Sequence, residues 1–243
     1  MALIGLFSDV HANLEALKAV FSDMEKQKID VAHFLGDAVG YGCDPNACIG
    51  LIEKNCDIKI IGNHDFGALG LESAENFNDL AKTSLEWTTS EITKRSLATL
   101  ADFQIEVKFD DIHLVHASPK NPEDWEYILV AEQAKEQFVG GDSWVTFLGH
   151  THIPAFFSVD KSGTVSQKTL MEAELDKNKR YIINVGSVGQ PRDRDPRCCY
   201  VTFDTDSEHL RYHRVDYDIS SAQRRMEALG FPKMLSERLA LGR

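Results

Sequence analysis

Residues 144–157 read WVTFLGHTHIPAFF, a short apolar run that leads into two histidines. Val145–Leu148 carries β-branched and aromatic side chains without a charge, which predicts a buried β-strand. Gly149 follows, and then His150 and His152, whose imidazoles are costly to bury without a partner. A half-exposed strand end could hold both histidines at little cost, so this stretch alone is compatible with either a tolerated strand end or a functional site.

The order of apolar runs around this stretch predicts an α/β (α+β) fold. The chain opens with a predicted strand at 2–7, an amphipathic helix at 13–28 and a second strand at 31–35, an order typical of parallel α/β units. Apolar runs at 105–109 and 112–116 flank two aspartates and predict a β-hairpin. Further strands are predicted at 58–61, 145–148, 155–159, 181–185, 199–203 and 210–215. So many strands predict two sheets packed together and flanked by helices.

The chain is expected to form a single domain over residues 1–243, because no repeat, low-complexity run or linker interrupts it. Residues 72–103 are helical in pattern and largely polar. This segment is either a helical insertion that caps an active site, with Phe66 or Trp87 as an apolar wall, or an ordinary helix that covers a sheet.

Composition narrows the class of protein. The formal net charge is −12, so the chain lacks the general attraction to nucleic acids and anionic membranes that clustered Lys and Arg provide. No apolar stretch approaches the roughly 18 residues that a membrane-spanning helix needs. The five cysteines show no C-x-x-C pair, which favours unpaired thiols in a reducing compartment. We therefore expect a cytoplasmic protein without a membrane partner.

Polar side chains follow five of the predicted strands at the point where each strand ends. The first strand is followed by SDVH, the second by GDAVGYG and the third by GNHD, while the strand 112–116 ends in a histidine and the strand 145–148 is followed by GHTH. The carboxyl ends of such strands are where sites assemble in α/β folds. Two carboxylates, one carboxamide and four imidazoles are too many ligands for one tetrahedral zinc ion and suit two divalent ions that share a carboxylate. These residues are Asp9, His11, Asp37, Asn63, His116, His150 and His152.

This set of motifs resembles that of the calcineurin-like metallophosphoesterases, in the family's order, from residue 9 to residue 152. The resemblance implies two mixed β-sheets packed as a sandwich, with helices on both outer faces and a dinuclear metal site at the strand ends. It also implies that Asp9, His11, Asp37 and His152 hold one ion, while Asn63, His116, His150 and the shared Asp37 hold the other. The ions would be Mn, Fe, Zn or Co, because nitrogen and oxygen ligands without thiolate suit all four metals.

The same resemblance implies roles in catalysis for two residues beside the ligands. His64 would face the substrate, stabilise the transition state and protonate the leaving alkoxide after attack by a metal-bound hydroxide, and Asp65 would orient its ring. Phosphate contacts are expected from Arg192 or Arg194 in the loop GSVGQPRDRD, although a solvated loop with internal Arg–Asp pairs explains these arginines equally well. Tyr41 either lines the pocket or packs in the core.

The expected function is therefore hydrolysis of a small phosphomonoester or phosphodiester, with the bacterial and archaeal phosphodiesterase-like members as the most similar branch. No arginine follows Asp37 closely, which disfavours the branch of protein Ser/Thr phosphatases. A nuclease acting on short nucleic acid is the alternative enzyme, disfavoured by the acidic charge. A catalytically silent scaffold for protein interactions is the alternative outside enzymes. The metal, the ester preference and the oligomeric state remain open from the sequence.

Overall fold

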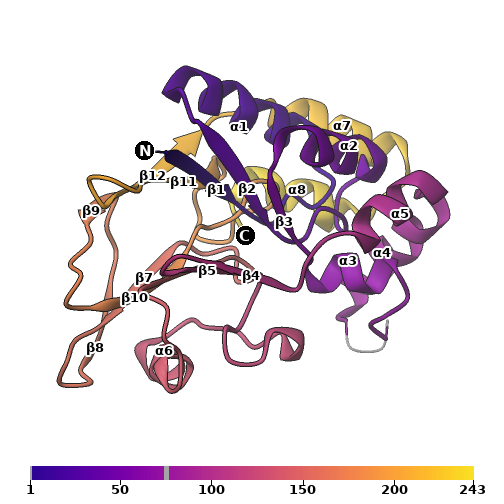
Figure 1. The fold of residues 1–243 in the computed structure, drawn as a ribbon. Helices are drawn as coiled ribbons and strands as arrows, with labels where there is room; N and C mark the ends of the chain where they lie inside the picture. Colours follow the sequence, from indigo (N-terminus) through magenta and orange to yellow (C-terminus); the bar gives the residue numbers. More distant parts are fainter. Residues whose placement is uncertain (1, 74–76) are drawn as a thin grey trace.

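The computed structural model describes residues 2–73 and 77–243, which form two six-stranded mixed β-sheets packed face to face (Figure 1). In spatial order, the first sheet consists of β3 (Ile58–Ile60), β2 (Val31–Leu35), β1 (Leu3–Phe7), β11 (Cys198–Asp204), β12 (His209–Val215) and β9 (Glu172–Glu174). The second sheet consists of β4 (Glu106–Phe109), β5 (Ile112–Val115), β6 (Val145–Leu148), β10 (Arg180–Asn184), β7 (Ala155–Val159) and β8 (Val165–Lys168). The predicted α/β sandwich of two mixed sheets is confirmed.

Helices lie on both outer faces of this sandwich, as expected. The helices are α1 (Leu14–Gln27), α2 (Pro45–Asn55), α3 (Asn63–Ala68), α4 (Asp79–Glu91), α5 (Lys94–Ala101), α6 (Ala131–Phe138), α7 (Ile219–Ala228) and α8 (Lys233–Leu241), with a short 3-10 helix at Pro122–Asp124. Figure 1 shows α1, α2 and α7 over the first sheet and α6 under the second, while α3, α4 and α5 gather at one end.

Consecutive residues of the central strands pack on opposite faces of their sheets. In β1, Leu6 lies in the apolar layer between the sheets, whereas Phe7 packs in the layer that includes Leu17 of α1. In β6, Phe147 faces the space between the sheets and Leu148 belongs to the cluster that includes Phe138 of α6. Because both faces of these strands are buried, their sequences are continuous apolar runs and do not alternate with polar residues.

Asn13 joins the start of α1 to a distant loop. Its side-chain Oδ1 caps the helix by accepting a hydrogen bond from the amide of Ala16 at 3.2 Å, and its Nδ2 donates to the carbonyl of Gly189 at 2.9 Å. The segment after β1 and the loop after β10 are thereby held together, and both contribute to the site described below.

The predicted helical segment 72–103 contains α4 and α5, and its residues 74–76 lie outside the described part of the chain. The ring of Trp87 packs against Phe231, with centroids 4.6 Å apart, in an apolar cluster that also contains Tyr41 and residues of α7 and α8. Phe66 packs instead against Trp125, at 5.2 Å. Ser84 of α4 accepts a hydrogen bond from the amide of Tyr41 at 3.0 Å, so this helix supports the loop after β2.

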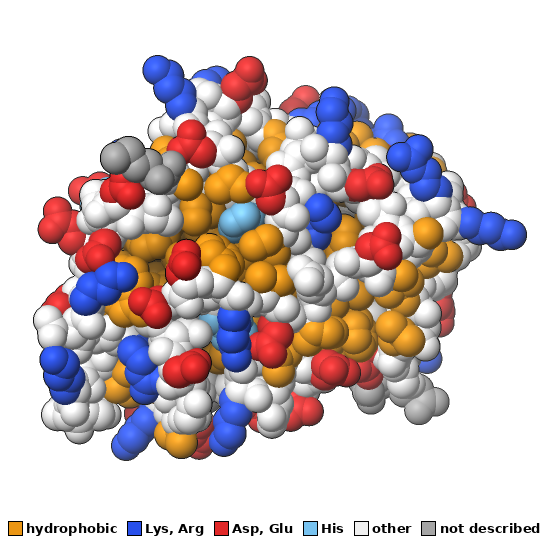
Figure 2. All heavy atoms as spheres, in the orientation of Figure 1, with side chains coloured by type: hydrophobic (Ala, Val, Ile, Leu, Met, Phe, Trp, Pro, Cys, Tyr) orange, Lys and Arg blue, Asp and Glu red, His pale blue; other side chains and the backbone are white. Residues whose placement is uncertain are grey.

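Among the described residues, no helix is both long enough and apolar enough to cross a membrane. On the face in view in Figure 2, Lys and Arg side chains are scattered among Asp and Glu side chains, so this face carries no continuous basic stripe.

Candidate metal centre

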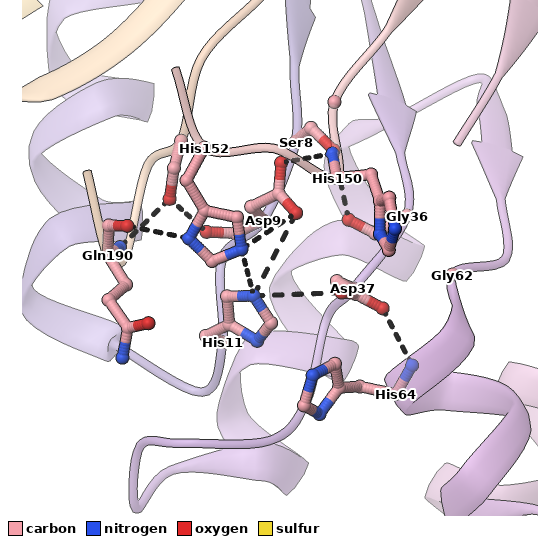
Figure 3. Close-up of polar contacts among 12 residues, drawn as sticks. Ser8, Asp9, His11, Gly36, Asp37, Gly62, His64, His150, His152 and Gln190 are labelled. Atoms are coloured by element: carbon pink, nitrogen blue, oxygen red, sulfur yellow. Dashed lines mark hydrogen bonds and ion pairs between the residues drawn. The ribbon is translucent and has the colours of Figure 1, made fainter. Parts of the chain in front are cut away.

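Residues that follow five strands form one buried cluster of carboxylate and imidazole side chains, and Figure 3 shows those that follow β1, β2, β3 and β6. The segments after β1, β2 and β3 contribute from the first sheet, and the segments after β5 and β6 contribute from the second. The residues that the structure brings together in this way are Asp9, His11, Asp37, His64, His116, His150 and His152, all buried.

The first group in the cluster joins the two sheets through Asp9, His11 and His152. The Nε2 atoms of His11 and His152 lie 3.0 Å apart, and Oδ1 of Asp9 lies 3.8 Å and 3.4 Å from them, respectively. The Nδ1 atoms of the two imidazoles are bonded to the carbonyls of Val39 at 2.8 Å and Gln190 at 2.7 Å. With the Nδ1 protons donated to these carbonyls, both Nε2 atoms present lone pairs to the same point, which is the arrangement that a cation stabilises.

The second group consists of Asp37, His116 and His150, whose potential ligand atoms lie within 4.8 Å of one another. Nδ1 of His116 is bonded to the carbonyl of Leu35 at 2.8 Å, which leaves Nε2 to face Oδ2 of Asp37 at 3.4 Å. Nε2 of His150 is bonded to the carbonyl of Trp125 at 2.8 Å, so its Nδ1 is the nitrogen left for a metal. Each imidazole is thus oriented by a carbonyl, as metal-binding histidines usually are.

Asp37 belongs to both halves of the cluster. Its Oδ2 lies 3.6 Å from Nε2 of His11 in the first group and 3.4 Å from Nε2 of His116 in the second. Its Oδ1 accepts a hydrogen bond from the amide of His64 at 2.9 Å, which fixes the carboxylate between the groups. A carboxylate in this position can bridge two ions.

Within the described part of the chain, three buried atoms of the predicted ligands have no hydrogen-bond partner: Oδ1 of Asp9, Oδ1 of Asn63 and Nε2 of His116. Leaving a buried polar atom unpaired costs about 1–3 kcal/mol. The two oxygens carry lone pairs, and Nε2 of His116 presents one when its imidazole is neutral, so each atom can act as a ligand to a divalent cation. The residues present therefore fit the metal ions that the sequence predicts.

Burial and neighbouring charges shift the pKa values of the cluster. Burial lowers the pKa of His116, but the carboxylates of Asp37 and Asp9 outweigh it and raise this pKa to about 9. Burial raises the pKa of Asp9 to about 7, in spite of the opposing influence of His116. Burial would also raise the pKa of Asp37, but the imidazoles of His116 and His64 hold it below its usual range. Burial lowers the pKa of His150 to about 3, so this imidazole is neutral, the form that binds metals.

His64 adjoins the cluster without an orienting carboxylate. Its ring lies 4.9 Å from that of His11, 4.7 Å from that of Tyr41 and 5.0 Å from that of Phe77, measured between centroids. Its Nδ1 is buried and makes no hydrogen bond to any residue that the structure describes. Burial lowers the pKa of His64 to about 4.

The structure corrects the predicted contact of Asp65. Both of its oxygens accept backbone amides, and neither is bonded to the ring of His64: Oδ2 accepts the amides of Asp37 and Gly62, and Oδ1 accepts those of Ala38 and Val39, at 2.9–3.2 Å. Asp65 therefore positions the loop that carries Asp37. A carboxylate one residue from His64 is held at the wrong side of the helix start to reach its ring, because consecutive residues of a helix point in different directions.

A sequence model of the calcineurin-like phosphoesterase superfamily domain matches residues 2–208. The chain belongs to this superfamily. It is 38% identical over 247 residues to an uncharacterized protein of Methanocaldococcus jannaschii, an alignment that covers 100% of this chain and 99% of the relative. The resemblance inferred from the strand-end motifs is thus confirmed.

Solved structures show the same fold. A metallophosphoesterase from Sphaerobacter thermophilus superposes with a TM-score of 0.87 at 37% identity, over 100% of this chain and 99% of that one. A hypothetical protein from Pyrococcus horikoshii superposes with a TM-score of 0.79 at 18% identity, with the same coverage, and supports the fold alone. Membership of the phosphoesterase superfamily and the buried Asp/His groups together support a metal-dependent phosphoesterase at the general level.

Of the predicted substrate contacts in this phosphoesterase, Tyr41 and Arg192 lie beside the centre. The buried ring of Tyr41 packs 4.8 Å from that of His11, and the guanidinium carbon of Arg192 lies 5.5 Å from the Tyr41 centroid. The amide of Arg192 donates to the carbonyl of His152 at 3.1 Å. Arg194 is exposed, and its amide donates to the carbonyl of Gly242, so it is Arg192 that the loop brings to the site.

Several residues at the site carry no sequence signal that identifies them. Gln190 and Trp125 act through their carbonyls, which any residue could supply. The half-exposed ring of Tyr127 stacks on His150 with centroids 4.3 Å apart, although it lies in an irregular loop more than 20 residues earlier. Arg238 of α8 lies near Tyr41 from the far end of the sequence.

Proposed function

We propose that this chain hydrolyses a small phosphomonoester or phosphodiester with the help of two divalent metal ions. The observation that carries the proposal is the position of Asp37 between two groups of potential ligands, 3.6 Å from Nε2 of His11 and 3.4 Å from Nε2 of His116. Oδ1 of Asp9 in the first group and Nε2 of His116 in the second have no hydrogen-bond partner among the described residues. Asp9, His11 and His152 would hold one ion together with Asp37. Asn63, His116 and His150 would hold the other together with the same carboxylate. Manganese is the metal we would test first.

When bound, two such ions neutralise the charge of a phosphate and supply an activated water at neutral pH. The protein's own contribution is orientation, because carbonyls fix the imidazoles of His11, His116, His150 and His152 before the ions bind.

His64 is proposed as the residue that acts on the leaving group. Its ring adjoins His11 and Tyr41 and comes within reach of the cluster formed with Asp37, so an ester bound there would contact it. Burial lowers the pKa of His64, and the charge of a bound phosphate would raise it again, so that the imidazolium can donate its proton to the departing oxygen, a contribution of roughly 10²–10⁴-fold in rate. Arg192 is proposed to contact a phosphate oxygen, since its guanidinium lies on the ring of Tyr41 next to the cluster.

The two alternatives, a nuclease and a catalytically silent scaffold, would require different features of the protein. A nuclease would need a basic track for the backbone, whereas acidic and basic side chains are interspersed on the face in Figure 2 and the chain has a net charge of −12. A silent scaffold would not need a buried His64 beside a complete ligand set. A cytoplasmic location is proposed from the five buried, unpaired cysteines.

The test is hydrolysis of p-nitrophenyl phosphate and bis-p-nitrophenyl phosphate by metal-stripped protein titrated with Mn²⁺, beside a short single-stranded oligonucleotide. We expect Mn²⁺-dependent release of nitrophenol, and the ratio of the two rates gives the preference for monoesters or diesters. His64→Ala should lose roughly 10²–10⁴-fold in rate while it keeps its metal. His209→Ala, a matched change of a part-exposed histidine on β12, should behave as wild type.

No release from either ester by protein that has bound its ions would contradict the proposal and favour the scaffold. Cleavage of the oligonucleotide alone would favour the nuclease.

A further inference from the structure

Two arginines from distant parts of the chain lie against the same side chain at the edge of the metal centre. The guanidinium carbons of Arg192, in the loop after β10, and Arg238, in α8, lie 5.5 Å and 5.8 Å from the centroid of the Tyr41 ring. The same ring packs on the imidazoles of His11 and His64 at 4.8 Å and 4.7 Å. Both guanidinium groups are therefore one aromatic ring away from the centre.

Neither of these guanidinium groups has an Asp or Glu side chain within 4 Å among the described residues. Arg192 donates through one terminal nitrogen to Oε1 of Gln190 at 2.9 Å, and its Nε is buried without a hydrogen bond to the described part of the chain. Arg238 donates through Nε to the carbonyl of Arg243. Each group thus keeps donors free for a ligand.

Nearby arginines of the same region are paired. Arg214 forms an ion pair with Asp193, and Arg197 forms one with Asp195 at 2.7 Å. Two adjacent cations without counter-ions are unfavourable in a half-buried setting, and burial together with the charge of Arg192 lowers the pKa of Arg238. Two arginines beside the metal centre that have no Asp or Glu partner among the described residues have the charge and the donors to bind an external anion.

A backbone hydrogen bond joins the two segments that carry these arginines. The amide of Arg194, two residues after Arg192, donates to the carbonyl of Gly242 at 2.8 Å, which fastens the end of α8 to the loop after β10. Leu235 and Leu239 of α8 are buried in the same apolar cluster as Tyr41. The helix α8 is therefore anchored beside the loop after β10, and it lies beyond residues 2–208, the part that the superfamily model matches.

We propose that Arg192 and Arg238 together bind a second phosphate group of the substrate, which makes the substrate a compound with two or more linked phosphates, such as a diphosphate ester. The inference rests on the proposed function, because it places the reacting phosphate at the metal centre. A planar guanidinium can donate two parallel hydrogen bonds to two oxygens of a phosphate. Two guanidinium groups beside the same Tyr41 ring therefore suit a phosphate group with several free oxygens.

The experiment is calorimetric titration of Mn²⁺-loaded protein with inorganic orthophosphate and with inorganic pyrophosphate. Wild type should bind pyrophosphate at least tenfold more tightly than orthophosphate. Arg238→Gln should lose about 10–100-fold in affinity for pyrophosphate and much less for orthophosphate, because hydrogen bonds to charged groups are the strong ones. Arg238→Lys should recover only part of the loss, since it restores the charge without the fork.

Arg224→Gln is the matched control, because Arg224 is an exposed arginine of α7 that bonds Ser221 and should titrate as wild type. Each titration contains the same free Mn²⁺, so the binding of either anion to free Mn²⁺ is the same for every variant and does not affect the comparison of variants. An unchanged ratio of the two affinities in Arg238→Gln would overturn the inference, and so would an equal loss for both anions.

Hydrolysis of p-nitrophenyl phosphate separates this inference from the proposed function. Wild type that turns over no ester contradicts the proposed function, whatever the titrations give. Wild type that turns over the ester while Arg238→Gln binds pyrophosphate normally overturns the second-phosphate site alone.

Discussion

The predicted ligands have an unusual backbone conformation at the scale of the single residue. Five of them have a positive φ in the left-handed region, with values of 48–66°. Residues other than glycine adopt this region at a cost of roughly 1–3 kcal/mol each, and they do so mainly at functional sites. The five are Asp9, His11, Asp37, His150 and His152. These five conformations therefore lower the stability of the fold, and they direct the five side chains toward the same cluster.

Gly40 tests how closely His64, the residue proposed to act on the leaving group, must be held. A Cβ atom at Gly40 would lie 2.4 Å from Nδ1 of His64, and φ is +84°, so Gly40→Ala must displace the imidazole or the loop. We expect a loss of about 100-fold in the rate of ester hydrolysis with the metal content unchanged, because a displacement of about 1 Å is enough for such a loss. Steady-state kinetics and elemental analysis measure the two quantities.

Gly50→Ala is the matched control for that change. Gly50 lies in α2, and a Cβ atom there would meet no described atom within 4 Å, so its substitution should leave the rate unchanged. It should also raise the free energy of unfolding by about 0.5–1 kcal/mol, because alanine loses less conformational freedom than glycine in a helix. A Gly40→Ala variant with the wild-type rate would show that His64 needs no fixed position.

Residue types were predictable from the sequence, but their partners were not. The ligands could be found because metal binding requires carboxylates and imidazoles at strand ends. The roles of Asp65 and Arg238 could not be found, because they depend on where four backbone amides and one tyrosine ring lie in space.

At the scale of the element, the loop after β2 depends on the first turn of α3. Asp65 of α3 accepts the amides of Asp37, Ala38 and Val39, so a single carboxylate holds three consecutive residues of that loop. Gly62 lies so close that a Cβ atom there would be 2.2 Å from Oδ1 of Asp37. The start of α3, which carries Asn63 and His64, is thereby held against the loop after β2, which carries Asp37, the proposed shared ligand.

Asp65→Asn should weaken the attachment of the loop after β2 to α3 without removing a proposed metal ligand. One of the two oxygens is replaced by a donor, so at least one of the backbone amides loses its acceptor. We expect the affinity for Mn²⁺ to fall by about 10–100-fold, as for other residues that orient metal ligands, and the free energy of unfolding to fall by about 1–3 kcal/mol. Calorimetric titration with Mn²⁺ and urea denaturation measure these effects, and an unchanged Mn²⁺ affinity would contradict the role assigned to Asp65.

The strands and helices that could be predicted from the sequence are those that have a buried face. The strands that bear ligands read as apolar runs and were predicted within a residue or two. The short strands Val165–Lys168 and Glu172–Glu174 were not predicted, because both are largely exposed and their sequences, VSQK and EAE, lack an apolar pattern. Their place in the sheets is set by pairing with β7 and β12.

At the scale of the whole molecule, bound cations would reconcile the acidic charge with a phosphate substrate. The chain has a net charge of −12, and two divalent ions would change the sign of the local field at the centre. The same ions would tie both sheets together, since His11 and Asp9 come from the first sheet while His150 and His152 follow β6 of the second.

Chelation should therefore destabilise the entire fold. An ion present at 100 times its dissociation constant stabilises the folded state by about 2.7 kcal/mol, which for a chain of this size corresponds to roughly 5–10 °C in melting temperature. Thermal unfolding with EDTA and with added Mn²⁺ measures the shift. Equal melting temperatures in the two conditions would mean that no ion joins the sheets.

The central claim is that Asp37 is shared by two metal ions, and native mass spectrometry of the Mn²⁺-reconstituted protein tests it most directly. Wild type is predicted to carry two ions per chain and Asp37→Asn fewer than one, because the change weakens both sites at once. A wild type that carries at most one ion, or an Asp37→Asn variant that still carries two, would contradict the shared centre.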